Sequence, residues 1–278
     1  MASSSSSSSQ SSLPPAAMKD RRYINWAELP SELTSSILVR LGAIEILEDA
    51  QKVCTSWRHA CKDPSMWRKI VMRGLGVEYD LEVMCRHAVD RSQGGLLEIE
   101  IWQFGTDSLL TYIADRSSNL RSLRLIMCNL KITGYGLILA VVKLPLLEEL
   151  ELSHCSLAGE SLKAIGRTCP NLKTLKLNKF CHRDCGIVSD DEALAIAAAM
   201  PGLRHLQIFG NYLTNTGLNA ILDNCPNLEH LDLRRCFNVN LVGDLEKRCL
   251  ERIRVLRRPN DSTLDYPFHA TIVVMDSC

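Results

Sequence analysis

A repeating apolar triplet constrains the fold of this chain more than any other feature. Seven segments place large apolar residues at relative positions zero, three and five. They are Leu96-Ile99-Ile101, Leu120-Leu123-Leu125, Leu147-Leu150-Leu152, Leu172-Leu175-Leu177, Leu203-Leu206-Ile208, Leu228-Leu231-Leu233 and Leu250-Ile253-Val255. Successive triplets start 24, 27, 25, 31, 25 and 22 residues apart. Such a period is typical of a solenoid, in which each repeat buries its apolar face against its neighbours.

Each repeat contains signals for a short strand followed by a helix. In the segment Leu175-Lys176-Leu177, strand geometry puts the two leucines on one face and the lysine on the other. Apolar pairs at helical spacing follow, such as Leu162 and Ile165, and a proline often ends the unit. We therefore predict an α/β fold, a curved solenoid with parallel strands inside and helices outside.

The repeats resemble leucine-rich repeats of the cysteine-containing kind. That family places Cys or Asn three residues after the last strand leucine, as Asn211 is here, and Cys-Pro before the next repeat. Phe104 and Phe180 depart from the first rule. The resemblance covers residues 96–258, about seven repeats, with degraded end copies that suit solenoid termini. It implies burial of what we term the repeat cysteines: Cys128, Cys155, Cys169, Cys225 and Cys236.

The segment before the repeats does not follow their period. Leu33, Ile37, Leu38 and Leu41 share one face of a predicted helix, and a second apolar face runs from Leu47 to Trp57. About 45 residues in three short helices make a thin core. We therefore expect part of this apolar surface to serve a partner.

This segment resembles an F-box. The matching features are Leu29-Pro30, Ile37-Leu38, Leu41, Val53-Cys54, Trp57-Arg58 and the ending from Asp63-Pro64 to Trp67. Gly42 is a departure, since a proline often follows the first helix. The resemblance implies docking to a Skp-type adaptor, and through it to a cullin ubiquitin ligase. The implied adaptor-binding residues are Leu29, Pro30, Leu33, Ile37, Leu38, Leu41, Leu47 and Trp57. For Trp57 and Trp67 the alternative is a purely structural role.

An F-box directly before leucine-rich repeats, with a serine-rich start, resembles plant F-box/leucine-rich-repeat proteins. We divide the chain accordingly into five parts. They are a disordered serine-rich tail (1–22), the F-box (23–72), a helical linker (73–95), the repeats (96–258) and a C-terminal tail (259–278).

The concave side of the predicted arc is the expected binding surface. Strand residues between and just after the leucines point to this side. We predict that the captured protein contacts Trp102, Arg124, Glu149, Glu151, Lys176, Phe209, His230 and Arg254. Trp102 and Phe209 are the expected apolar anchors, because each follows a buried strand residue. The alternative is that both pack sideways on their neighbours.

The repeat that starts at Leu172 carries an insertion, Cys181–Asp190. Its Cys-His-Arg-Asp-Cys segment suggests zinc, but zinc needs four ligands and no second pair lies nearby in sequence. We therefore predict no metal site, and expect a solvated or partner-contacting loop. The sequence has no phosphate-binding glycine loop, nucleophile elbow or zinc-protease motif, so we predict no catalytic residue and no cofactor.

Charge and composition limit the partners. Lys plus Arg and Asp plus Glu each total 32, so net charge provides no attraction to nucleic acid or anionic membranes. No apolar run reaches the ~18 residues of a membrane span, and the start of the chain does not resemble a secretory signal. Twelve cysteines in such a chain indicate reduced thiols, and hence the nucleus or cytoplasm.

Together these features predict the substrate-recognition subunit of a Skp-cullin-F-box ubiquitin ligase, whose repeat arc captures an unknown protein. The alternative is a scaffold without ligase function, in which the front helices only cap the solenoid. An enzyme is the least favoured hypothesis, because nothing in the sequence marks an activated nucleophile.

Overall fold

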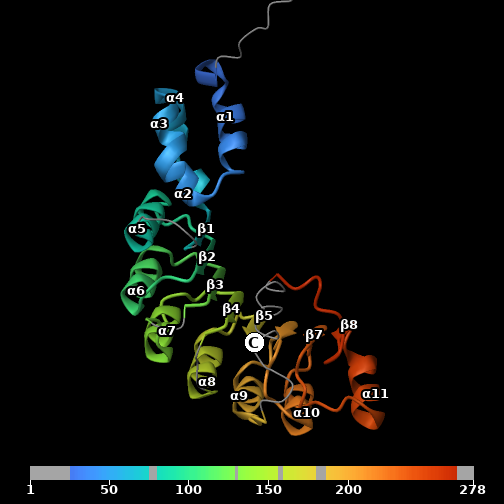
Figure 1. Cartoon of the computed structure of the whole chain (residues 1–278). Helices are drawn as coiled ribbons and strands as arrows, with labels where there is room; N and C mark the ends of the chain where they lie inside the picture. Colours follow the sequence, from blue (N-terminus) through green and yellow to red (C-terminus); the bar gives the residue numbers. More distant parts are fainter. Residues whose placement is uncertain (1–25, 75–79, 129–130, 156–158, 180–185, 268–278) are drawn as a thin grey trace, which may run out of the picture.

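The computed structural model describes residues 26–74, 80–128, 131–155, 159–179 and 186–267. Figure 1 shows a short helical unit followed by a curved array, with strands along its inner side and helices along its outer side. The predicted fold class is thereby confirmed. The predicted tail (1–22) and the Cys-His-Arg-Asp-Cys part of the insertion lie outside the described residues. None of the described helices combines the length and apolar composition that crossing a bilayer requires.

The front module, residues 26–67, consists of short helical segments. They are η1 (Trp26–Glu28), α1 (Ser31–Leu38), α2 (Ala43–Glu45), η2 (Ile46–Ala50), α3 (Gln51–Val53), α4 (Thr55–Ala60) and η3 (Pro64–Trp67). Cys54 separates α3 from α4 with an extended backbone, and its sulfur accepts a hydrogen bond from the Trp57 N–H at 3.5 Å. Asp63 caps η3 by accepting from the Ser65 N–H at 2.9 Å, which satisfies an otherwise unpaired helix donor.

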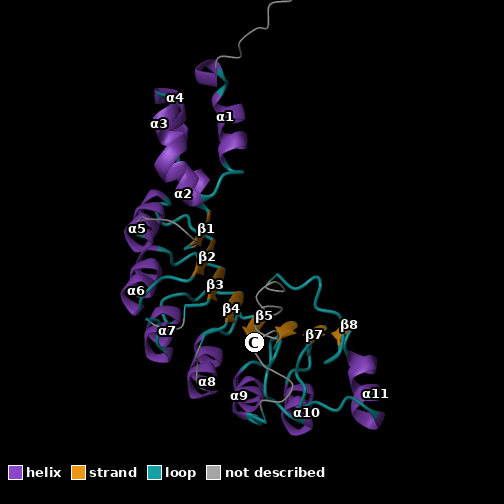
Figure 2. Ribbon diagram, viewed as in Figure 1, coloured by secondary structure: helices purple, strands orange, loops and turns teal. Residues whose placement is uncertain are grey.

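Within the described residues, eight parallel strands form one sheet in chain order. They are β1 (Lys69–Arg73), β2 (Glu98–Trp102), β3 (Ser122–Ile126), β4 (Glu149–Ser153), β5 (Thr174–Asn178), β6 (His205–Gln207), β7 (His230–Asp232) and β8 (Val255–Arg257). The intervening helices are α5 (Leu81–Arg91), α6 (Asp107–Arg116), α7 (Gly134–Val141), α8 (Gly159–Thr168), α9 (Asp191–Ala199), α10 (Asn215–Asn224) and α11 (Gly243–Arg252). Figure 2 shows that each helix returns the chain along the outside of the arc.

The apolar triplets form the core of the solenoid. Leu123 pairs in register with Ile99 on one side and Leu150 on the other, and Leu150 pairs with Leu175. Each of these four side chains is at most 1% exposed. Equivalent residues of successive coils therefore stack in one continuous buried column, as the spacing predicts.

A left-handed residue follows most of the strands. Gln103, Met127, His154, Gly210 and Arg235 all have positive φ and occupy the same repeat position. Their N–H groups extend the hydrogen bonding beyond the strands, as when Met127 donates to the Ser153 carbonyl at 2.8 Å. A non-glycine residue costs about 1 kcal/mol in this conformation, which the turn offsets by pairing backbone groups that would otherwise be buried alone.

Hydrogen bonds between coils fix the starts of two helices. The Asp190 carboxylate accepts from the Thr214 N–H and hydroxyl, both at 2.7 Å, and from the Gly217 N–H at 3.2 Å. A Cβ on Gly217 would lie 2.3 Å from the Asp190 oxygen, so only glycine allows this approach. The same arrangement joins Asp107 to Thr133 in an earlier coil.

The solenoid begins earlier than we predicted. We expected an F-box to residue 72 and a helical linker over 73–95, whereas β1 and α5 form a complete coil. Ile70 lies opposite Ile99, and Met72 lies opposite Ile101. The spacing of Trp67, Ile70 and Met72 is therefore an eighth triplet, in which tryptophan and methionine replace leucine.

The register of the last coil also differs from the prediction. We assigned the triplet Leu250-Ile253-Val255, which would place Arg254 on the concave face. In β8, Leu256 lies opposite the buried Leu231, so the repeat starts three residues later. An odd shift moves every side chain to the opposite face of a strand. The predicted position of Arg254 is therefore wrong: it precedes β8, and Arg257 lies on the concave face instead.

The repeat cysteines explain how neighbouring coils approach closely. Four of them are buried, and Cys155 is half-buried. The Cys128 thiol donates to the Phe104 carbonyl at 3.1 Å, and the Cys236 thiol donates to the Ile208 carbonyl at 3.0 Å, each in the preceding coil. Burial raises the pKa of Cys128 to about 11 and that of Cys155 to about 12. These thiols therefore remain protonated donors at neutral pH.

Candidate functional site

Four large apolar side chains of the front module are exposed to solvent. Trp26, Leu33, Val39 and Val53 are each more than half exposed. Among the predicted adaptor-binding residues, Leu33 and Pro30 are exposed, whereas the following are half-buried: Leu29, Ile37, Leu41 and Trp57. A unit of this size gains no stability from apolar groups left in water, so their exposure is typical of a binding surface.

Two predicted adaptor-binding residues lie inside the module instead. Leu38 is 0% exposed and Leu47 is 6% exposed. A side chain without accessible surface makes no direct contact, so these leucines can only support the exposed ones. Trp57 is half-buried and donates from Nε1 to the Trp26 carbonyl at 3.2 Å. Trp67 is 1% exposed, which fits the structural alternative for this residue.

One arginine of the first coil joins the two parts of the molecule. Arg91, in the last turn of α5, donates to the Gln51 side-chain oxygen at 2.8 Å and to the Cys61 carbonyl at 3.4 Å. Its guanidinium also lies 5.4 Å from the centre of the Trp67 ring. The front module and the solenoid therefore contact each other through Arg91 and the buried Trp67.

The charged residues on the concave face of β2–β5 neutralise one another. Arg124 forms ion pairs with Glu100 at 3.0 Å, Glu149 at 3.2 Å and Glu151 at 3.5 Å. Lys176 lies 2.9 Å from Glu149 and 3.6 Å from Glu151. Burial alone would raise the pKa of Glu149, but bonding to Lys176 and Arg124 outweighs this effect and holds the pKa below its usual value. The structure thus brings four predicted recognition residues together, but in an internal network.

Glu151 is the most buried member of that network. It is 6% exposed, and the Ser153 hydroxyl donates to it at 2.7 Å. From Ser153 the hydrogen bonds continue to Asn178 at 2.7 Å and then to Gln207 at 2.8 Å. A buried carboxylate held this way positions its neighbours and offers little surface to a partner.

The predicted anchor Phe209 is not exposed. Residues 259–266, here termed the C-terminal strap, turn back from β8 toward the middle of the sheet (Figure 1). Tyr266 stacks on Phe209 with ring centres 3.9 Å apart, which leaves Phe209 only 1% exposed. Ile126 is buried in the same cluster. The prediction for Phe209 as an exposed anchor is wrong, because sequence periodicity gave no sign that the strap covers it.

The strap is held by charge as well as by aromatic contact. Arg234 is 5% exposed and donates to Asp265 at 2.6 Å and to the Ser262 carbonyl at 3.0 Å. Arg257 donates to the same Asp265 oxygen at 2.8 Å. The Tyr266 hydroxyl lies 3.5 Å from His154 Nε2. The strap therefore spans the rim from β8 back to β4.

The other predicted anchor, Trp102 in β2, is half-buried and packs against the same cluster of Ile126, Phe209 and Tyr266. Its Nε1 donates to Glu100 at 2.5 Å, and the Arg73 guanidinium lies 4.6 Å from its ring centre. One face of the indole is thus covered by Arg73, which matches the alternative of sideways packing in part. Some of the indole surface stays accessible to a partner.

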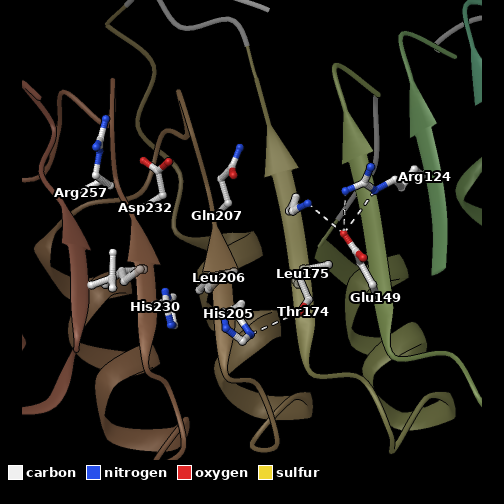
Figure 3. Close-up of a pocket in the computed structure, with 13 residues that line it drawn as sticks. Arg124, Glu149, Thr174, Leu175, His205, Leu206, Gln207, His230, Asp232 and Arg257 are labelled. Carbon is white, nitrogen blue, oxygen red and sulfur yellow. Dashed lines mark hydrogen bonds and ion pairs between the residues drawn. The ribbon is translucent and has the colours of Figure 1, made fainter. Parts of the chain in front are cut away.

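A pocket of about 520 Å³ lies on the concave face from β3 to β8. Figure 3 shows its side chains in two rows, with His205 and His230 next to each other in the lower row and Asp232 and Arg257 in the upper one. The two imidazole rings are 4.4 Å apart. Burial and the neighbouring His230 lower the pKa of His205. Of the predicted recognition residues, the pocket includes Arg124, Glu149, Lys176 and His230.

Arg257 and His205 were left out of the predicted contact residues for different reasons. Arg257 was displaced by the wrong register of the last coil. The repeat spacing places His205 on the concave face like His230, but it was not selected as a contact residue; in the structure the two lie opposite each other across β6 and β7. In the part of the chain that the structure describes, no three His, Cys, Asp or Glu side chains group as metal ligands.

Comparison with known proteins agrees with both halves of the structure. A family model described as F-box-like matches residues 26–73. The chain is 68% identical to the F-box protein SKIP19 of Arabidopsis thaliana over 92% of its length and 84% of the relative. It is 57% identical to the putative F-box/LRR-repeat protein 22 of the same plant, over 96% of this chain and 88% of that protein. The chain is a member of this plant F-box/LRR-repeat family.

A solved structure supports the fold of this F-box/LRR-repeat protein. A chain in the crystal structure of the yeast Rad7 and Elc1 complex superimposes with a TM-score of 0.52 and 16% sequence identity, over 82% of this chain and 59% of that chain. At such low identity the likeness concerns the fold alone. The F-box-like match ends at residue 73, the last residue of β1, so the matched segment already includes the first repeat strand.

Proposed function

We propose that this F-box/LRR-repeat protein is the substrate-recognition subunit of a Skp-cullin-F-box ubiquitin ligase. The front module docks a Skp-type adaptor, and the concave face of the arc captures a protein for ubiquitination. The observation that carries the proposal is the exposed apolar group at Trp26, Leu33, Val39 and Val53, within the segment that matches the F-box-like model.

The junction at Arg91 supports this role mechanically. A receptor of this kind accelerates ubiquitin transfer by holding substrate lysines near a charged conjugating enzyme, which raises their effective concentration. That effect depends on a fixed geometry between the docking surface and the capture surface. The bonds from Arg91 to Gln51 and Cys61 provide such a connection without a spacer.

We assign the covalent chemistry to the partners of this chain. A ligase that carries ubiquitin as a thioester needs an accessible cysteine with a thiolate-favouring environment. Burial instead raises the pKa of Cys85 and Cys155 to about 12 and that of Cys169 and Cys225 to about 11. Such thiols are protonated and shielded at neutral pH. Their reduced state fits a nuclear or cytoplasmic location, which we also propose.

Binding to a purified Skp-type adaptor tests the proposal. We expect Leu33→Asp to lower the affinity of the full-length chain at least about tenfold, because a carboxylate would be desolvated in an apolar interface. Leu264→Asp is the matched control, since this leucine is 77% exposed on the strap, far along the chain from the front module. The paired change of Leu29 and Pro30 to Ala, and Ile37→Asp, should act like Leu33→Asp.

The alternative function makes the opposite prediction. If the front module only caps the solenoid, all of these variants and the wild-type chain will fail to bind the adaptor, or will bind it equally. Circular dichroism and thermal unfolding of each variant show whether the repeats remain folded. Equal binding by all folded variants would remove the F-box assignment and favour the scaffold.

A further inference from the structure

The charged and polar groups that line the concave pocket from β3 to β8 are unequally paired within the protein. Its two carboxylates already have cationic partners within the protein. Glu149 is bound by Arg124 and Lys176, and the Asp232 carboxylate accepts hydrogen bonds from Arg234, including those from Nη2 at 2.7 Å and from Nε at 3.0 Å. These acids therefore have little remaining capacity to attract a cationic ligand.

The hydrogen-bond donors of the pocket have fewer partners within the protein than its carboxylates have. Neither His205 nor His230 has a carboxylate among its hydrogen-bond partners in the described residues, and the nearest polar contact of His205 is the Thr174 hydroxyl at 3.5 Å. Arg257 uses Nη2 for Asp265 and the Ser262 carbonyl. Its Nε is buried and cannot reach a ligand, so only the rest of the guanidinium, which lines the pocket, can face an anion. The pocket thus offers more donors than acceptors.

We propose that this pocket binds an anionic group, a carboxylate or a phosphate, carried by an extended peptide segment of the captured protein. The inference rests on the proposed function, because it names the class of substrate that the receptor's concave face takes. His205 and His230 donate to the anion from the lower row of the pocket, and Arg257 donates from the upper row.

The shape of the site favours an extended segment. The lining side chains come from neighbouring parallel strands, which lie about 4.8 Å apart, so a peptide crossing them meets one strand after another. Val255 lies opposite His230 in the register of β7 and β8 and is 43% exposed. An apolar side chain next to the anionic one would cover Val255. The expected motif is therefore an acidic or phosphorylated residue with an apolar neighbour.

Three degenerate peptide pools with identical flanks test the proposal. Their central residue is phosphoserine, glutamate or serine, and binding to the full-length chain is measured by fluorescence polarisation. We expect at least one anionic pool to bind about tenfold more tightly than the serine pool, since charge-assisted hydrogen bonds are the stronger ones. Selection of phosphoserine alone identifies phosphate as the source of the anion, and selection of both identifies any acid.

Variants locate the site. His205→Ala combined with His230→Ala should remove the preference for anionic pools, and Arg257→Gln should weaken it. Arg254→Gln is the matched control, because Arg254 is exposed, lies three residues away and does not line the pocket. Arg257 also bonds to Asp265 in the strap. Thermal unfolding of the Arg257→Gln variant must therefore show that the strap stays in place. The two histidines form none of the strap bonds described above.

Two results would overturn the inference. One is equal binding of the three pools by wild-type protein, and the other is an anionic preference that survives in the histidine double variant. Adaptor binding measured on the same preparation distinguishes a failure of the pocket assignment from a failure of the proposed receptor function. If the adaptor binds and the pools do not differ, the pocket assignment is wrong and the receptor role stands. If the anionic pools are selected but no adaptor binds, the receptor role fails.

Discussion

His154 should make the folded chain sensitive to mild acid. This residue follows β4 in a left-handed conformation with φ 57°, is 5% exposed, and lies 3.5 Å from the hydroxyl of the strap residue Tyr266. Burial lowers the pKa of His154 from 6.5 to about 4. The imidazole is therefore neutral in the folded protein across the physiological range.

The direction and size of the effect follow from this pKa. Below pH 6.5 the unfolded chain takes up a proton at this site, whereas the folded chain does not until the pH approaches 4. The stability contribution of neutral His154 is thus present above pH 6.5 and is lost as the pH falls toward 4. At pH 5 the loss is about 2 kcal/mol, because each pKa unit corresponds to about 1.4 kcal/mol. That is a large share of a typical folding free energy of about 5–15 kcal/mol.

Urea unfolding at pH 7.5 and pH 5.0 measures this contribution. The matched variant is His154→Asn, since asparagine tolerates the left-handed conformation and does not titrate. We expect the free energy of unfolding of the wild type to fall by about 2 kcal/mol more than that of the variant. Nuclear magnetic resonance gives the pKa of the imidazole directly. A folded-state value of 6 or higher, or equal pH sensitivity of the two proteins, would refute the reasoning.

Three further predictions concern packing. Gly217→Ala should destabilise the chain by about 2 kcal/mol, since its Cβ would lie 2.3 Å from Asp190, whereas Gly202→Ala, whose nearest neighbour is 3.8 Å away, should change stability little in thermal unfolding. Tyr266→Ala should cost about 3 kcal/mol and speed hydrogen exchange in the strap, because it removes the partner of Phe209; unchanged exchange would contradict the strap's role. The repeat cysteines should react slowly with a thiol reagent and completely after unfolding; rapid labelling of all five in the native protein would contradict their burial.

The sequence predicts the repeat architecture well because stacked coils demand the same residue type at the same position. Leu123 and Leu150 illustrate this demand, since each buries its side chain against the equivalent residue of the next coil. The first coil was missed because Trp67 can serve both the front module and the sheet. The end of the array was misplaced because Leu250 and Ile253 imitate the start of a triplet, and the terminal coil has no following neighbour to fix its register.

The contacts on the concave face were harder to predict than the fold. The alternation of side chains along a strand places Arg124, Glu149 and Lys176 on the concave face. This alternation does not predict that the three residues form ion pairs with one another across three strands. Phe209 has the sequence position of an exposed anchor and is covered by Tyr266, more than fifty residues later in the chain. Contacts at such separation leave no periodic trace, so only the folded chain reveals them.

Trp67 is part of both the front module and the solenoid, because it is the last residue of η3 and the first residue of the first apolar triplet. The distance from the front module to a given strand of the concave face therefore depends on the number of coils between them. Each coil advances that face by one strand spacing, about 4.8 Å. Relatives that gain or lose a repeat between β1 and β5 would present the same peptide one fixed step farther from, or nearer to, whatever the front module holds. Under the proposed receptor function, repeat number would set which substrate lysines come within reach, independently of how tightly the peptide is bound.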